Sequence, residues 1–229
     1  MTSAVAKIAA RILLSLAVLY GVLVGLGLIL TKVIQHSGLI HDEDQLNKTL
    51  ADGRTSPMNH ITYWLSGLGN TGAIVGAMLV VAIGLRLASR SWIPSVFLVV
   101  AVASQSIVFL LTTLVIKRRR PNVPHLDKSP PTSSFPSGHT GASTALFLGS
   151  ALLVLWYVKR RWVKIIGVTL LVAVPLLVGY GRLYRGMHHP TDVAAAYLNG
   201  TTCIAIAAVN ILRRDRLRTT PALASAGPH

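Results

Sequence analysis

The sequence predicts an all-α protein, a polytopic membrane bundle of about six transmembrane helices with both termini on the cytoplasmic side. The composition is 52% hydrophobic and only 13% charged, which is too apolar for an ordinary soluble domain. Apolar runs of bilayer length recur along the chain, and short basic runs flank them. Because the 229 residues show no break in composition, we expect one membrane domain over residues 1–229, with a motif-bearing core at about 92–212.

Each long apolar run is assigned to one span, since a bilayer core needs about 20 apolar residues per helix. The expected spans are 12–30, a second whose firmly apolar part is 73–87, then 92–116, 137–158, 163–180 and 190–212. We expect the first to be a retained helix rather than a signal peptide. It is longer than a normal signal core, and no small-residue cleavage site follows it.

Three segments between the spans have a different character. Residues 36–56 are polar and are expected outside the membrane as a short interfacial helix. Met58 to Leu68 follows Ser56 and Pro57, a helix cap and a first helical position, so we expect it to form the opening turns of the second span. Residues 122–134 are broken by prolines and are expected to form a loop that borders the site.

Charge at the span ends predicts the orientation, because cytoplasmic flanks collect Lys and Arg. All acidic residues except Asp215 then lie outside. The net charge of +15 is explained by basic residues that flank the spans and contact anionic lipid headgroups, so we discount nucleic acid as a partner. The single cysteine, Cys203, allows no disulfide framework and no cysteine-based metal site. The basic residues expected inside are Lys7, Arg11, Arg86, Arg90, Lys159, Arg160, Arg161, Lys164, Arg213, Arg214, Arg216 and Arg218.

Two basic groups break this pattern on the outer side, namely Lys117 to Arg120 and Arg182 with Arg185. Anion binding is the natural cause, because the planar donor fork of arginine matches phosphate oxygens. Arg120 and Arg182 are therefore the first phosphate-binding candidates. Lys117 is a third, since it shares a helical face with Arg120 if the third span is still helical there, whereas Arg118 should point elsewhere. The alternative is that this run only anchors a helix end at lipid headgroups.

The tetrapeptide Pro136-Ser137-Gly138-His139 opens the fourth span. Ser137 is a good N-cap, and the helix start would offer free backbone N–H groups and a positive dipole end to a phosphate. Gly138 allows close approach of the backbone. His139 is placed to give a proton to a departing oxygen. Alone, a capped helix is more often structural than catalytic.

His188 and Asp192 are four positions apart around Pro190, which suits the first position of the sixth span. A carboxylate near one ring nitrogen fixes the tautomer and leaves the other nitrogen free to attack, so His188 is the candidate nucleophile. A capping interaction between neighbours is the alternative. We expect His125, Asp127 and His60 to be surface residues.

In this order, the three clusters resemble the motifs of the type 2 phosphatidic acid phosphatase superfamily of membrane phosphatases. The family pattern is Lys-x6-Arg-Pro, Pro-Ser-Gly-His and Ser-Arg-x5-His-x3-Asp. The chain departs from it at two positions: Thr113 replaces the lysine and Gly181 replaces the serine before Arg182. Lys117 is the possible stand-in for the missing lysine.

The resemblance implies hydrolysis of a lipid phosphate through a phosphohistidine on His188, without a metal or other cofactor. The substrate would be a polyprenyl pyrophosphate, phosphatidate or phosphatidylglycerol phosphate, held in a bacterial plasma membrane with the active site on the extracytoplasmic side. The family roles fall on His188, His139 and Asp192 for catalysis and on Arg120, Arg182, Ser137 and Gly138 for phosphate binding.

Three other classes were weighed. A membrane protein that binds or transports an anionic lipid phosphate could use the same arginines without hydrolysis, but it would not need His139, His188 and Asp192 in these places. Soluble vanadate-dependent haloperoxidases are similar at the same motifs but lack membrane spans. A purely structural membrane protein leaves the outer basic run unexplained. The oligomeric state stays open.

Overall fold

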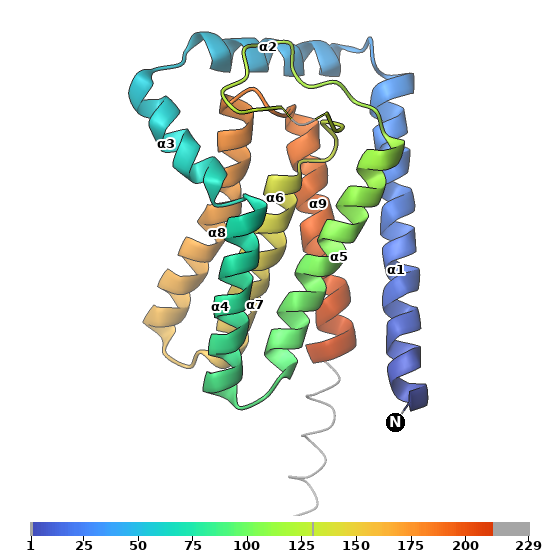
Figure 1. Ribbon diagram of the computed structural model, residues 1–229, viewed down its shortest axis with the longest axis vertical. Helices are drawn as coiled ribbons and strands as arrows, with labels where there is room; N and C mark the ends of the chain where they lie inside the picture. Colours follow the sequence, from blue (N-terminus) through green and yellow to red (C-terminus); the bar gives the residue numbers. More distant parts are fainter. Residues whose placement is uncertain (1, 130, 213–229) are drawn as a thin grey trace, which may run out of the picture.

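The computed structural model describes residues 2–129 and 131–212. Within these ranges the chain forms helices and no strands, which confirms the all-α prediction. Most of the helices run roughly along one direction and form an elongated bundle (Figure 1). Pro130, Asp215 and the expected basic flank at 213–218 lie outside the described residues.

Six helical segments of the described chain are long and apolar enough to cross a membrane, so this is an integral membrane protein. Three of them contain a π-helical turn (η). The segments are α1 (Thr2–Leu28) with η1 (Ile29–Val33), α4 (Thr71–Ser89), α5 (Ile93–Val115), α6 (Gly138–Ser143) with η2 (Thr144–Leu148) and α7 (Gly149–Tyr157), α8 (Arg161–Tyr184), and α9 (Pro190–Ala207) with η3 (Ala208–Leu212).

The centre of the bundle is formed by α5, the α6–α7 segment and α9. Phe97 and Leu98 of α5 are fully buried and belong to the same apolar cluster as Leu146 of η2. At the crossing of α9 with this segment, a Cβ on Gly200 would lie 2.7 Å from Cβ of Thr144. Small residues of this kind let membrane helices approach closely, which fixes the relative positions of the helix ends that form the site.

Two shorter helices, α2 (Gly38–Asp52) and α3 (Ser56–Gly67), precede α4. Helix α2 lies across one end of the bundle (Figure 1), where a short helix was expected. The prediction that Met58 to Leu68 opens the second span is wrong. Helix α3 ends at Gly67, and α4 starts separately at Thr71, where Asn70 caps it by accepting a hydrogen bond from the Gly72 amide at 3.3 Å.

The two ends of the bundle differ in what they contain. The start of α1, the α4–α5 and α7–α8 connections and the end of η3 lie at one end (Figure 1). The opposite end contains α2, the long loop after α5 and the α8–α9 turn. All three sequence clusters therefore reach the end that α2 covers.

Candidate active site

A cavity of about 930 Å³ opens at the α2 end of the bundle. Its lining includes Arg120 from the long loop, Gly138 and His139 from the start of α6, Arg182 from the last turn of α8, and His188 from the α8–α9 turn. We call it the arginine–histidine cavity. Residues that are distant in sequence thus meet at one point, as the three clusters predicted.

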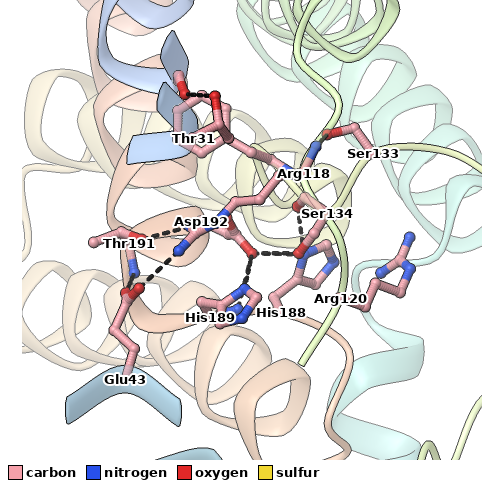
Figure 2. A network of polar contacts seen from close by, with 12 residues as sticks. Thr31, Glu43, Arg118, Arg120, Ser133, Ser134, His188, His189, Thr191 and Asp192 are labelled. Carbon is pink, nitrogen blue, oxygen red and sulfur yellow. Dashed lines mark hydrogen bonds and ion pairs between the residues drawn. The ribbon is translucent and has the colours of Figure 1, made fainter. Parts of the chain in front are cut away.

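The imidazole of His188 is held by the backbone rather than by a carboxylate. Its Nδ1 lies 2.7 Å from the carbonyl oxygen of Ser134, which can only accept, so Nδ1 donates and Nε2 keeps its lone pair (Figure 2). Oδ2 of Asp192 is 3.8 Å from Nδ1, beyond hydrogen-bond reach. Burial lowers the pKa of His188 to about 4, an effect that the Asp192 carboxylate opposes and the charges of Arg182 and Arg120 reinforce. His188 is therefore neutral at ordinary pH.

The carboxylate of Asp192 is fully buried and fully engaged. Arg118 donates to Oδ1 at 2.6 Å, and the Ser134 hydroxyl and the His189 amide both donate to Oδ2, the latter at 2.8 Å. Since Ser134 also contacts His188 through its carbonyl, Asp192 fixes the segment that orients the imidazole (Figure 2). It acts on the ring chiefly through Ser134 and through its charge.

Arg118 points toward the site, and the prediction that it points elsewhere is wrong. Helix α5 ends at Val115, Ile116 is extended, and the residues that follow are non-helical and alternate between buried and exposed. In an extended segment side chains alternate, so Arg118 and Arg120 share one side, while Lys117 faces the other, is exposed and does not line the arginine–histidine cavity. The expectation that Lys117 shares a helical face with Arg120 is therefore also wrong.

Helix α2 reaches the site through Glu43, which sequence reasoning missed. Glu43 is 3% exposed and accepts from Arg118 at 2.7 Å and from the Thr191 amide at 2.6 Å. Arg118 thus bridges the carboxylates of Glu43 and Asp192 (Figure 2). Nothing in the acidic run Asp42-Glu43-Asp44 distinguishes the buried residue from its neighbours.

Arg120 and Arg182 keep donors available beside the cavity. Arg120 donates to the carbonyl oxygen of Met187 at 2.7 Å, and Arg182 donates to the Ser66 hydroxyl and to Asp127, each at 2.8 Å. The Nε atoms of both arginines are buried and have no hydrogen-bond partner among the described residues. Burial lowers the pKa of Arg120, an effect that Asp192 opposes. An oxyanion in the cavity would supply the missing acceptors.

Asp127 is not a surface residue, contrary to the prediction. It pairs with Arg182 at 2.8 Å and with Arg185 at 2.7 Å, and it lines the arginine–histidine cavity. Burial alone would raise its pKa, but the hydrogen bonds from Arg185 and the charges of both arginines lower it. His125 and His60 are exposed, as expected.

The start of the fourth span has the predicted form. Ser137 occupies the N-cap position, but its hydroxyl lies 3.0 Å from that of Thr140 and makes no capping bond to the backbone. A Cβ on Gly138 would lie 2.7 Å from Cζ of Phe109, so only glycine fits there without a shift. His139 is partly exposed and lines the cavity beside His188.

The two departures from the motif have different structural consequences. Thr113 is buried in α5, where its hydroxyl donates to the Leu110 carbonyl at 2.7 Å, so no lysine reaches the site from there. Next to Gly181, the hydroxyl of Ser66 on α3 contacts Arg182 and lines the cavity. A hydroxyl beside this arginine therefore comes from another helix. Within the described residues, no group of three or more His, Cys, Asp or Glu side chains could hold a metal ion.

The fold and the cavity define an integral membrane protein with a cationic, histidine-bearing pocket at one end of a helical bundle. The model of the PAP2 superfamily matches residues 94–216, and the chain belongs to this family. An undecaprenyl-diphosphatase from Sulfolobus acidocaldarius is 36% identical over 76 residues, which are 33% of this chain and 32% of that protein. The match thus spans about a third of that relative's length.

Two solved structures share the fold. One is a transmembrane PAP2-type phosphatidylglycerolphosphate phosphatase from Bacillus subtilis, with a TM-score of 0.69 and 19% identity over 85% of this chain and 92% of that chain. The other is LpxE from Aquifex aeolicus, with a TM-score of 0.56 and 21% identity over 71% of this chain and 92% of that chain. At these identities the likeness concerns the fold alone.

Proposed function

We propose that this protein is a metal-independent phosphatase that hydrolyses a phosphomonoester or pyrophosphate of a membrane lipid. The observation that carries the proposal is the convergence of His188, His139, Arg120 and Arg182 on one cavity. The two unpartnered Nε atoms beside a neutral imidazole form a place where an oxyanion would be held next to a nucleophile.

In the proposed reaction, Nε2 of His188 attacks phosphorus and the bond to the leaving oxygen breaks. His139, which would take up a proton when the anionic phosphate binds beside it, gives that proton to the leaving oxygen, and the product is a lipid alcohol or a lipid monophosphate. His139 then accepts a proton from water, whose oxygen attacks the phosphohistidine and releases inorganic phosphate. Arg120 and Arg182, with Ser137 and the Gly138 amide, would hold the other phosphate oxygens, and their fixed charge would replace the role of a metal.

The cavity also supports a lipid as the substrate. Below the polar groups its lining continues over apolar side chains of α4 and α5, including Ile74, Val75, Phe109 and Leu110. An acyl or prenyl chain would lie there while its phosphate reaches the arginines. We infer from the distribution of basic flanks that this end of the bundle faces the extracytoplasmic side of a bacterial plasma membrane.

The test is a phosphate-release assay on the purified protein with EDTA present, across phosphatidate, phosphatidylglycerol phosphate and a polyprenyl pyrophosphate. We expect release from at least one of these lipids, and loss of more than about a thousandfold in kcat for His188→Ala, because the nucleophile is removed. His125→Ala, which changes an exposed histidine, is the matched control and should retain wild-type turnover.

Two results would contradict the proposal. Normal turnover by a folded His188→Ala variant would exclude His188 as the nucleophile. Tight binding of the lipids without any release of phosphate would instead identify a lipid-phosphate binding or transport protein.

A further inference from the structure

A second cavity, of about 780 Å³, lies between the extended segment after α5 and the end of α1 with η1. Among its lining residues it shares only Arg120 with the arginine–histidine cavity. Lys32 of η1 lines it together with Lys117 and Arg119. Arg118 and Arg120 line it too, but they donate to Asp192 and to the Met187 carbonyl. The proposed reaction uses none of Lys32, Lys117 and Arg119.

The side chains of residues 117–120 alternate between two sides of the chain. Arg118 and Arg120 turn toward Asp192 and the Met187 carbonyl, so Lys117 and Arg119 turn away from that site and are exposed. The side chains of Lys32, Lys117 and Arg119 form no hydrogen bond or ion pair with any other described residue. Their charges are therefore available to a ligand.

The second cavity is apolar on one side and cationic on the other. Leu28, Leu30 and Ile116 line it near the ends of the first and third spans. Lys32 lies in the last turn of the first span, and Lys117 and Arg119 lie just beyond the end of the third. A phospholipid phosphate lies at this boundary of the hydrocarbon layer, where each nearby Lys or Arg contributes about 1 kcal/mol of attraction. Asp44 is the one acidic residue among the described lining, and it lies 3.6 Å from His189. The cavity is thus net positive.

We propose that the second cavity is a binding site for an anionic phospholipid that is not a substrate. Its phosphodiester would lie among Lys32, Lys117 and Arg119, and one of its chains would lie against Leu28, Leu30 and Ile116, where α1 and α5 pack against each other. The apolar side of the cavity favours a lipid over free inorganic phosphate, which has no chain to bury. The site is independent of the proposed hydrolysis.

The test is a native mass spectrometry titration of the full-length protein in detergent with phosphatidylglycerol, compared with phosphatidylcholine. We expect preferential retention of one phosphatidylglycerol. The triple variant Lys32→Gln, Lys117→Gln and Arg119→Gln should bind it at least about tenfold more weakly, because three attractive charges are lost. The matched control removes three exposed charges from the α7–α8 turn, through Lys159→Gln, Arg160→Gln and Arg161→Gln, and should bind normally.

The fold of the triple variant is checked by its unfolding temperature without added lipid. If the triple variant does not fold, the single variant Lys117→Glu, which changes an exposed residue, is tested in its place. If the wild type and these variants bound phosphatidylglycerol equally, the lipid would not occupy the second cavity and the proposal would be overturned. The same follows if only Arg182→Gln weakened binding, because the lipid would then occupy the arginine–histidine cavity. Displacement of the lipid by inorganic phosphate alone would overturn the lipid assignment in favour of a simple anion site.

Discussion

At the scale of single residues, the orientation of His188 depends on one backbone carbonyl. Sequence spacing predicted that Asp192 would fix the tautomer directly, but the Ser134 carbonyl takes the Nδ1 proton and Asp192 holds Ser134 in turn. One ring nitrogen is thus held and the other is free, although the group that holds it is not the one predicted. Sequence could not reveal the intermediate, because Ser134 lies in the proline-rich loop, whose path is set by packing and not by a helical or strand period.

The first residue-scale prediction concerns pH. Because burial lowers the pKa of His188 to about 4, its ring is neutral and nucleophilic above that pH and is lost as a nucleophile when pH falls through that value. We expect kcat/KM for phosphate release to show no loss assignable to His188 between pH 6.5 and pH 5, and to fall tenfold per pH unit below about 4. The measurement is a pH profile of kcat/KM in detergent.

The control for this profile is reversibility, shown by full recovery of activity after a return from acidic buffer to neutral pH. If the amount of phosphohistidine trapped fell with an ionisation near pH 6.5, that ionisation would belong to His188. Its pKa would then be unshifted, which would contradict the burial argument.

At the scale of elements, the spans were predictable and the connections between functional elements were not. The apolar runs predicted six helices because bilayer thickness fixes helix length. Pro121 limits how far α5 can extend. A residue before proline is disfavoured in helical conformation, so Arg120 had to lie beyond the helix and Lys117 could not share a helical face with it. The role of Glu43 required tertiary contacts that no local pattern contains.

The element-scale prediction is that Glu43 fastens α2 to the site. Glu43→Gln leaves Arg118 with one carboxylate instead of two and weakens the bond to the Thr191 amide. Since one partner of a buried pair is removed, we expect the free energy of unfolding to fall by about 3 kcal/mol. Displacement of Asp192 should also lower kcat by about tenfold or more. Thermal unfolding and phosphate release measure the two effects.

Asp42→Asn is the matched control, because it removes an exposed carboxylate from the same turn of α2. It should leave both quantities near their wild-type values. If Glu43→Gln lowered stability without any change in kcat, α2 would be a structural cover only and the link through Arg118 to Asp192 would have no catalytic consequence.

At the scale of the whole molecule, buried ion pairs distinguish the α2 end of the bundle from the opposite end. The end opposite α2 has basic flanks such as Lys159 and Arg160 that are exposed and belong to no ion pair among the described residues. At the α2 end, Arg118, Arg182 and Arg185 are buried and paired with acids. The first pattern is typical of cytoplasmic loops, and the second is typical of a functional site.

This difference predicts that α2 faces the outside of the cell. The only cysteine in the chain, Cys203, is fully buried, so it should not react with a maleimide reagent that cannot cross membranes. Asp52→Cys places an exposed thiol at the end of α2, and Lys159→Cys places one in the α7–α8 turn at the other end. We expect the reagent to label Asp52→Cys in intact cells and Lys159→Cys only after the membrane is made permeable. The wild-type chain is the unlabelled control. The reverse pattern would place the arginine–histidine cavity in the cytoplasm, and its lipid substrates would then have to come from the inner leaflet.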